Sequence, residues 1–233
     1  MTNENTVWSL LEKVIPHTPR LLLYGIPGTG KSYQASNLSV KKEQQVYTTT
    51  LTHDSTAAEL MGHYVPTDTG SFEWIDGLGI RAWREGARLV INEIDHAGAD
   101  VMTFLHALLD DPQFAKFTLP NKEKETVRPA DGFQAIATMN GVPSDLGDAL
   151  RDRFPVTMKI DTVHPDALNV LPKNIRAVYN DFEHDAFSIR RWSAFANLMS
   201  SGLSKEDSVR AVFPNESSMI LEALALQEHN DTQ

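Results

Sequence analysis

A glycine-rich octapeptide that directly follows a short apolar run constrains the fold of this chain more than any other feature. Residues 25–32 read Gly-Ile-Pro-Gly-Thr-Gly-Lys-Ser, and they follow the apolar run from Leu21 to Tyr24. A strand that turns through glycines into a helix presents a row of backbone N–H groups, and the absence of side chains lets an anion approach them. Glycines at the first and sixth positions before Lys-Ser mark a phosphate-binding loop. The sequence therefore predicts an α/β fold that binds a nucleoside triphosphate.

The loop predicts how the triphosphate and its metal ion are held. Gly28 and Gly30 let the backbone approach the β-phosphate, and Lys31 supplies a flexible cation for the β- and γ-phosphates. The hydroxyl of Ser32 is placed to complete the coordination shell of Mg²⁺. The predicted cofactors are therefore ATP and Mg²⁺, and the predicted nucleotide-binding residues of the loop are Gly25, Pro27, Gly28, Thr29, Gly30, Lys31 and Ser32.

The composition of the chain narrows its role. With 233 residues, of which 41% are hydrophobic, the chain is large enough for one sizeable core and a small second one. The net charge of −10 opposes attraction to a polyanion, so nucleic acid is an unfavourable partner. The sequence has no cysteine, which excludes disulfides, and its histidines lack zinc-site spacing. Without a basic leader or a membrane-length apolar run, the sequence predicts a cytoplasmic chain with no membrane insertion.

Apolar runs and helical spacings alternate over the first two thirds of the chain. Strands are predicted at residues 21–24, 45–50, 88–92, 133–138 and 154–160, with helices between them and one at residues 7–14. This alternation indicates a five-stranded parallel sheet with helices on both faces. Beyond about residue 161 only amphipathic helices are predicted, at 188–200, from 204 onward and at 215–228. We therefore expect an N-terminal helix and lead-in over residues 1–19, an α/β core over 20–162 and a helical lid over 163–233.

Polar residues at the ends of two apolar strands are the candidates for hydrolysis, because ligands of such sheets bind outside the carboxyl ends of the strands. Glu93 directly follows the strand that ends at Asn92, and it is predicted to orient and polarise the attacking water. Asn140 follows the strand that ends at Thr138, and it is predicted to donate to the γ-phosphate or to hold the same water. The alternatives are a solvated surface carboxylate for Glu93 and an ordinary turn residue before Gly141 for Asn140.

Four motifs in this order resemble those of the AAA+ ATPases, and more narrowly those of the MoxR-type and dynein-related branch: GIPGTGKS, LVINEIDHA, AIATMNG and ALRDRF. The segments 56–66 and 70–77 resemble the insert that interrupts the second helix in this branch, and residues 117–128 resemble the hairpin before the Asn-bearing strand. The resemblance covers about residues 20–160. It implies a homo-oligomeric ring, most often a hexamer, with ATP bound between neighbouring subunits.

The resemblance also implies roles for arginines. In such rings an arginine of one subunit reaches the γ-phosphate bound to its neighbour, and Arg153 matches that position, with Arg151 as the alternative. An arginine in trans neutralises developing charge and makes hydrolysis depend on assembly. Arg190 matches the second sensor, an arginine of the lid that leans over the phosphates, with Arg191 as the alternative. The competing interpretations are an ion pair of Arg153 with a neighbouring aspartate and a solvated helix face for Arg190.

One position departs from the family pattern. The family usually carries Asp directly before the catalytic Glu, whereas this chain has Asn92. An amide oxygen accepts the same hydrogen bond from a metal-bound water but brings no negative charge. Asn92 and Ser32 are the predicted Mg²⁺ site, with Asn92 acting through water. We therefore expect a slow ATPase that requires Mg²⁺.

The leading functional hypothesis is a ring-forming ATPase that remodels or matures a protein partner, which by the resemblance carries a von Willebrand factor A domain. The first alternative is a nucleotide-gated assembly module with little turnover, in which Asn92 keeps hydrolysis low. The second is a motor stimulated by nucleic acid, which the net charge of −10 disfavours. A small-molecule kinase is a further option, but it leaves the Asn140 and Arg153 segments unexplained.

Two segments predict surface features. Tyr64, Phe72 and Trp74 lie in the insert, where they form either a docking surface for another protein or a cluster packed on the helix that follows. Lys122 and Lys124 lie at the tip of the second hairpin and alternate with glutamates, which is typical of a solvated turn and not of a nucleic-acid contact.

Overall fold

The computed structural model describes residues 6–182 and 187–230. Predictions that concern residues 1–5, 183–186 or 231–233 lie outside these ranges. The chain divides into two compact units, of which the first consists of Met1–Gly25 and Lys31–Lys159. The second consists of Ile26–Gly30 and Ile160–Gln233, so the short loop after residue 25 groups with the C-terminal helices.

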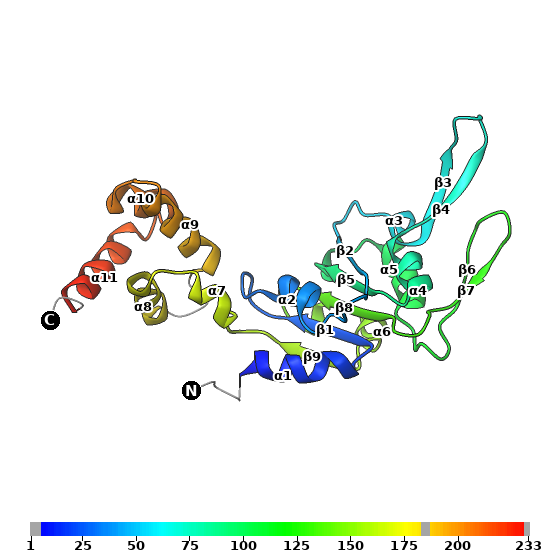
Figure 1. Ribbon diagram of the computed structural model, residues 1–233, viewed down its shortest axis with the longest axis horizontal. Coiled ribbons are helices and arrows are strands. Elements are labelled where there is room, and N and C mark those ends of the chain that lie inside the picture. Colours follow the sequence, from blue (N-terminus) through cyan, green and yellow to red (C-terminus); the bar gives the residue numbers. More distant parts are fainter. Residues whose placement is uncertain (1–5, 183–186, 231–233) are drawn as a thin grey trace. The chain divides into compact units, whose positions relative to one another are not determined.

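A five-stranded parallel sheet forms the centre of the first unit (Figure 1). Its spatial order is β2-β5-β8-β1-β9, and its strands are β1 (Arg20–Tyr24), β2 (Val46–Thr50), β5 (Arg88–Asn92), β8 (Gln134–Thr138) and β9 (Val156–Lys159). Every residue of β5 and β8 is buried, as expected of central strands that are covered on both faces. The predicted five-stranded parallel sheet is confirmed, because all of its pairings are parallel.

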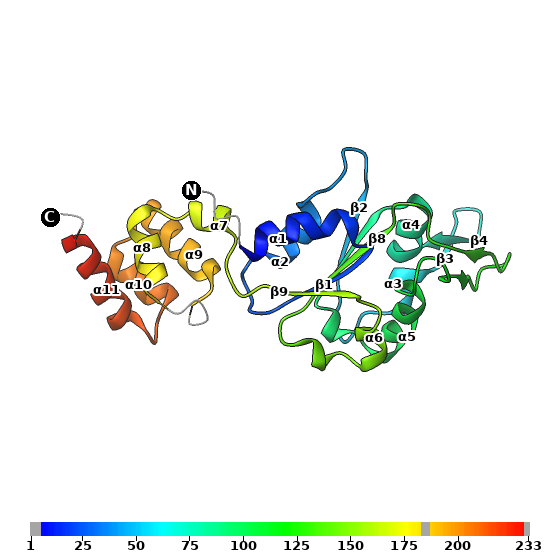
Figure 2. The ribbon, with the colours of Figure 1, turned by 90° about the horizontal axis from the view of Figure 1, so that it is seen from below.

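Helices cover both faces of this sheet. They are α1 (Val7–Val14), α2 (Lys31–Asn37), α3 (Ala57–Met61), α4 (Leu78–Glu85), α5 (Ala99–Leu108) and α6 (Asp148–Arg151), with short 3₁₀ turns at Ile15–His17, Ile94–His96 and Pro143–Asp145. Alternate strand residues such as Leu22 and Ile91 join one core with Trp83 of α4 and Leu105 of α5. Helices α5 and α6 lie side by side (Figure 2). Helix α2 packs on β5 and β8.

Two antiparallel hairpins extend from this unit close to each other (Figures 1 and 2). The first joins β3 (Gly62–Pro66) to β4 (Phe72–Asp76), and the second joins β6 (Phe117–Thr118) to β7 (Thr126–Val127). The first hairpin leaves and re-enters the core between α3 and α4 through a narrow neck. A Cβ atom on Gly77 would lie 2.5 Å from the carbonyl carbon of Leu60, so only glycine fits there.

A buried arginine fixes the end of the helix that follows the glycine-rich loop. Arg88, the first residue of β5, is 1% exposed, and its Nη1 donates to the carbonyls of Ala35 and Leu38 at 3.1 and 2.7 Å. Its Nε donates to Oε1 of Gln134 at 2.7 Å. Burial lowers the pKa of Arg88 to about 10. A cation at the carbonyl end of a helix is favourable, and here it holds α2 against the sheet.

Aromatic side chains build the core of the second unit. The ring of Trp192 is fully buried, with its centroid 5.0 Å from that of Phe213 and 6.2 Å from that of Tyr179. Phe187 and Phe195 complete the cluster. The helices around it are α7 (Pro165–Asn169), α8 (Lys173–Asp181), α9 (Ile189–Ser200), α10 (Lys205–Val212) and α11 (Ser217–Asn230).

The helices of this unit only partly match the predicted ones. Helices α9, α10 and α11 occupy the segments predicted as amphipathic, and Ser204 caps α10 by accepting the backbone N–H of Asp207 at 3.1 Å. Helices α7 and α8 were not predicted from the sequence. Among the described residues, none of the helices is both long and apolar enough to cross a bilayer.

Candidate nucleotide-binding site

The loop between β1 and α2 has the backbone of a phosphate-binding loop. Gly25, Gly28 and Gly30 have φ angles of +126°, +82° and +107°, which lie in the region that favours glycine. Thr29 is 1% exposed, and its hydroxyl donates to the carbonyl of Ile26 at 3.3 Å. The residues that turn the chain are therefore the glycines of the predicted motif, and a side chain at any of the three would be strained.

Lys31 and Asn140 lie together in the first unit. Lys31 is 6% exposed, and its ammonium donates to the carbonyl of Gly25 at 2.8 Å and to Oδ1 of Asn140 at 3.2 Å. The strand register explains the meeting, because Leu23 of β1 pairs with Thr138 of β8 and both chains continue past the same edge of the sheet. Two predicted site residues that are 109 positions apart are thus joined directly.

Thr138 links the two residues predicted for the metal. Its Oγ1 donates to Oδ1 of Asn92 at 3.0 Å and lies 3.4 Å from Oγ of Ser32. Because the single hydroxyl hydrogen of Thr138 goes to Asn92, the Ser32 hydroxyl is the donor in the second contact. The lone pairs of Ser32 are then left for a cation. Thr138 is only 3% exposed. No role was predicted for it from the sequence, although its position at the end of β8 marks it as a candidate site residue.

This oxygen set fits Mg²⁺. Magnesium usually takes one or two protein ligands and keeps several waters, and the exposed Ser32 hydroxyl with its oriented lone pairs has the chemistry of such a ligand. Asn92 is 8% exposed, and its amide lies directly behind Thr138. Among the described residues, no group of three or more histidine or acidic side chains forms an alternative metal site.

Glu93 has an unusual backbone conformation. Its φ and ψ are +54° and +47°, the left-handed region that non-glycine residues avoid at a cost of about 1–3 kcal/mol. The turn places its carboxylate, which is 41% exposed, 3.3 Å from Nδ1 of His96. Strain of this kind is common at functional sites. The carboxylate can accept a proton from a bound water, which is the chemistry predicted for it.

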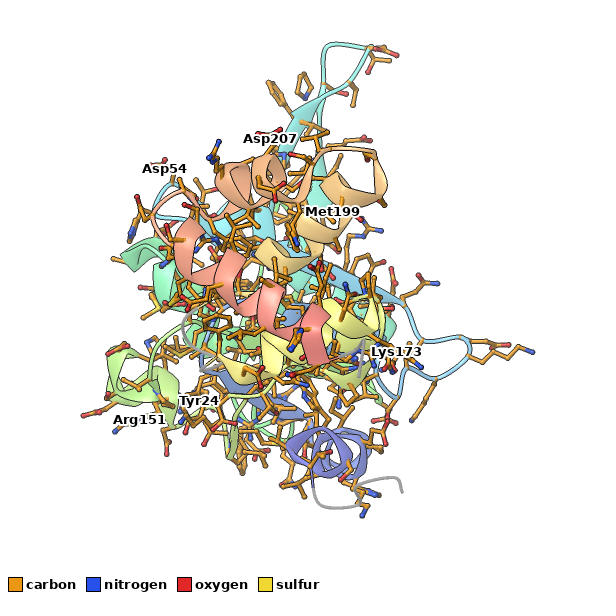
Figure 3. The ribbon with its side chains drawn as sticks, turned by 90° about the vertical axis from the view of Figure 1, so that its left-hand side faces the viewer. Tyr24, Asp54, Arg151, Lys173, Met199 and Asp207 are labelled. Atoms are coloured by element: carbon orange, nitrogen blue, oxygen red, sulfur yellow. The ribbon has the colours of Figure 1, made fainter. Side chains whose placement is uncertain are left out.

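The arginines predicted to act in trans make contacts within their own unit. Arg153 is 29% exposed, and its Nε donates to the carbonyl of His106 at 3.3 Å and lies 3.6 Å from Asp110. Arg151 lies at the end of α6 (Figure 3). It pairs with Asp148 at 2.7 Å. Among the described residues, no hydrogen bond or ion pair joins either arginine to the carboxylate of Glu93.

The second unit holds the other predicted arginine. Arg190 is exposed at the start of α9, whereas Arg191 donates to the carbonyl of Val212 at 2.7 Å and pairs with Glu216 at 3.1 Å. Within this unit the chain before α9 lies close to the glycine-rich loop, since a Cβ on Gly28 would be 3.1 Å from Cβ of Ser188. The contacts of Arg191 with Val212 and Glu216 indicate a structural role for it. Arg190 is the exposed arginine of the pair.

Comparison with known proteins gives one family match and several relatives. Residues 20–154 match the AAA domain of the dynein-related subfamily. The chain is similar to the protein NorQ of Paracoccus denitrificans, with 32% identity over 149 residues that cover 62% of this chain and 53% of NorQ. It is also similar to the denitrification regulatory protein NirQ of Stutzerimonas stutzeri, with 26% identity over 65% of this chain and 55% of NirQ. The chain thus spans about half the length of these relatives.

Solved structures share the fold at low sequence identity. NtrX from Brucella abortus in complex with ATP matches with a TM-score of 0.62 and 14% identity, covering 95% of this chain and 59% of NtrX. The same protein in complex with ADP matches with a TM-score of 0.58 and 14% identity, covering 84% of this chain and 49% of NtrX. At this identity the likeness establishes the fold alone.

Proposed function

Because the chain belongs to the dynein-related subfamily of AAA domains, we propose that it is a MoxR-like AAA+ ring protein that hydrolyses ATP to remodel or mature a protein partner. Family membership implies nucleotide binding and an ATP-dependent activity. The family match does not extend to the catalytic residues, the metal, the subunit number or the partner. These four points are what we propose.

The observation that carries the proposal is the meeting of polar side chains at the carboxyl ends of β1, β5 and β8. Lys31 and Asn140 are bonded there, and Thr138 connects Ser32 to Asn92. A phosphate placed beside this edge of the sheet would meet an ammonium, an amide and a hydroxyl in fixed positions. Such preorganised charges stabilise a transferring phosphoryl group without reorganisation during the reaction.

Glu93 is the proposed residue that activates water. Its carboxylate accepts a proton while the water oxygen forms a bond to the γ-phosphorus, and the bond from that phosphorus to the bridging oxygen of ADP breaks. The proton is then passed to the departing inorganic phosphate. Glu93→Gln keeps the size of the side chain and removes this base, so the variant is expected to bind ATP and to lose phosphate release. Undiminished hydrolysis by Glu93→Gln would remove Glu93 from this role.

Mg²⁺ held by Ser32, and by Asn92 through water, would neutralise charge on the β- and γ-phosphates. The missing negative charge at Asn92 weakens the hold on the ion, and it is the reason to expect slow turnover. Asn92→Asp restores that charge, so half-maximal phosphate release is expected at a lower Mg²⁺ concentration than in the wild type. An unchanged Mg²⁺ dependence would show that Asn92 does not tune the ion.

Arg153 is the proposed arginine that acts on the nucleotide of a neighbouring subunit. Mixing two inactive variants distinguishes this role from a role within a single subunit. Glu93→Gln and Arg153→Ala are each expected to be inactive, but mixed rings contain interfaces with an intact Glu93 on one side and an intact Arg153 on the other. Phosphate release should therefore recover on mixing. No recovery, in rings shown by light scattering to be mixed, would contradict action in trans, and Arg151→Ala tests the alternative arginine in the same way.

A second candidate function is a nucleotide-gated assembly module with little turnover, and the neutral Asn92 favours it. Light scattering with and without a non-hydrolysable ATP analogue identifies the concentration at which rings form, for which six subunits are expected. Phosphate release measured at that concentration separates the two functions. Stimulation by DNA or RNA would instead support a motor on nucleic acid, and capture of a von Willebrand factor A domain by the Glu93→Gln ring would identify the proposed partner.

A further inference from the structure

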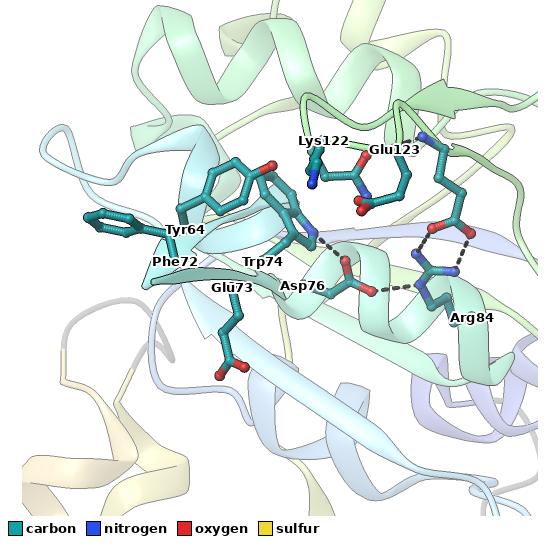
Figure 4. Close-up of a pocket in the computed structure, with 10 residues that line it drawn as sticks. Tyr64, Phe72, Glu73, Trp74, Asp76, Arg84, Lys122 and Glu123 are labelled. Atoms are coloured by element: carbon teal, nitrogen blue, oxygen red, sulfur yellow. Dashed lines mark hydrogen bonds and ion pairs between the residues drawn. The ribbon is translucent and has the colours of Figure 1, made fainter. Parts of the chain in front are cut away.

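A pocket lies between the two hairpins of the first unit (Figure 4). Its volume of about 560 Å³ is in the range of ligand-binding pockets. One wall comes from the first hairpin and the other from the turn between β6 and β7. Its lining includes Tyr64, Trp74, Arg84, Asn121, Lys122 and Glu123. None of them belongs to the candidate nucleotide-binding site.

A chain of polar contacts holds the two hairpins in place. Nε1 of Trp74 donates to Asp76 at 2.7 Å, and Nε of Arg84 donates to the other oxygen of Asp76 at 2.6 Å. Arg84 also holds Glu125 of the second hairpin with two parallel bonds of 2.7 and 2.6 Å (Figure 4). These hydrogen bonds raise the pKa of Arg84 and lower that of Glu125. The network therefore forms a preorganised wall in which one guanidinium faces two carboxylates, so one negative charge remains in excess.

The other polar side chains of the pocket lie outside this network of ion pairs. Within the described part of the chain, Glu123 forms no ion pair, and Lys122 is the sole cation beside it among the lining residues apart from the engaged Arg84. The carboxylate of Glu73 points away from Tyr64 and Trp74 (Figure 4). Asn121 is 7% exposed, and its Oδ1 accepts the backbone N–H of Glu125 at 3.2 Å. Its Nδ2 has no hydrogen-bond partner among the described residues. This nitrogen is not among the fully buried atoms that lack a partner, so it lies open to the pocket and can donate to a group that enters.

Aromatic faces complete the lining. The ring of Tyr64 stands edge-on to Trp74 with centroids 5.4 Å apart, and the side chain of Trp74 is fixed by its bond to Asp76. Tyr64 and Phe72 are 41% and 69% exposed. An aromatic face beside a carboxylate attracts a guanidinium or ammonium group, and the planar guanidinium of arginine suits both.

We propose that this pocket binds an extended peptide segment of a partner protein through an arginine or lysine side chain. The cationic head lies between Glu123 and the aromatic pair of Tyr64 and Trp74, and Asn121 donates its Nδ2 hydrogen to a backbone carbonyl of the segment. The excess of carboxylates over ammonium groups disfavours an anionic partner such as nucleic acid. The proposal concerns a site separate from nucleotide chemistry, so it stands or falls independently of ATP hydrolysis.

The test follows the indole N–H of Trp74 by NMR, assigned with Trp74→Phe, in the full chain. The probe is a nonapeptide, blocked at both ends, with arginine at alternate positions in a Gly-Ser background. Its twin carries citrulline, which keeps the shape and loses the charge. We expect the arginine probe to shift the Trp74 signal and to bind at least about fivefold more tightly than the citrulline twin. Equal binding of the two probes would overturn the proposal.

Matched variants separate this pocket from the overall negative charge. Glu123→Gln is expected to weaken binding of the arginine probe about fivefold, whereas Glu12→Gln, which removes the same charge at an exposed position of α1, leaves the affinity unchanged. Equal weakening by both variants would mean that only net charge attracts the probe, which would overturn the proposal. A stronger shift of the Trp74 signal by a single-stranded oligonucleotide than by the arginine probe would also overturn it.

Discussion

Replacing Thr138 by valine removes the hydroxyl that joins Ser32 to Asn92. The change takes away hydrogen bonds of 3.0 and 3.4 Å in a place where the threonine is 3% exposed, so water cannot replace them. The acceptor of Asn92, itself 8% exposed, is left without its donor at a cost of about 1–3 kcal/mol. The added methyl group returns about 0.8 kcal/mol. We expect the free energy of unfolding to fall by about 0.2–2 kcal/mol.

The effect on the metal is separate from the effect on stability. The hydroxyl of Ser32 loses its acceptor in Thr138→Val and rotates freely. Its lone pairs are then no longer directed toward the metal ion. Loss of such an outer partner commonly weakens metal affinity about 10–100-fold. We expect ADP to bind about tenfold more weakly than to the wild type in the presence of Mg²⁺, and equally well in its absence.

Calorimetry with ADP, with Mg²⁺ and with a chelator, measures the metal effect, and urea unfolding measures stability. Thr138→Ser keeps the hydroxyl and should behave like the wild type in the metal-dependent part. Thr157→Val makes the same change at an exposed position of β9 and should change neither quantity. A Thr138→Val variant that loses stability while its Mg²⁺-dependent affinity stays unchanged would refute the positioning of Ser32.

Three further changes test the fold around the site. Arg88→Met leaves Gln134 and the carbonyls at the end of α2 without their donor, so urea unfolding should show a loss of about 2–4 kcal/mol, and a loss below about 0.5 kcal/mol would contradict the anchoring of α2. Glu93→Gly relieves the φ angle of +54° and should raise the melting temperature while phosphate release is lost; a lower melting temperature than that of Glu93→Gln would argue against strain. Burial raises the pKa of Tyr179 above its ordinary 10.0, so the folded state keeps a proton that the unfolded state loses, and stability falls as the pH rises above about 10. Tyr179→Phe should flatten that alkaline decline in unfolding experiments, and an equally steep decline would assign it to other groups.

The sequence predicted the parts of the fold that depend on local pattern. Apolar runs such as Leu89 to Ile91 are long enough to cross a buried sheet, and their polar ends at Asn92 and Thr138 mark the carboxyl edge. The glycines of the loop indicate in the sequence that the backbone adopts positive φ angles there. Helix α8 was missed although Ile175, Val178 and Tyr179 have helical spacing and are buried, so the signal was present in the sequence. Helix α7 has five residues, too few for any periodicity to be visible.

The contacts between distant segments could not be predicted from the sequence. The bond between Thr138 and Asn92 depends on the register of β5 against β8, and the two residues are 46 positions apart. The clamp of Arg84 on Glu125 joins a helix to a hairpin 41 positions away. The left-handed backbone of Glu93 has no marker either, because glutamate is not a residue that favours that region. Such features arise from tertiary packing, which a single sequence does not reveal.

Binding of a triphosphate at the glycine-rich loop through Lys31 is tested most directly by titrating a non-hydrolysable ATP analogue with Mg²⁺ in a calorimeter. The wild type and Lys13→Ala, which alters an exposed lysine of α1, should bind with the same affinity. Lys31→Ala should bind more weakly by a factor of about 10 or more, since contacts of an ammonium with phosphate contribute about 1.5–3 kcal/mol each. Absence of heat with the folded wild type, or equal affinity of Lys31→Ala, would contradict the account.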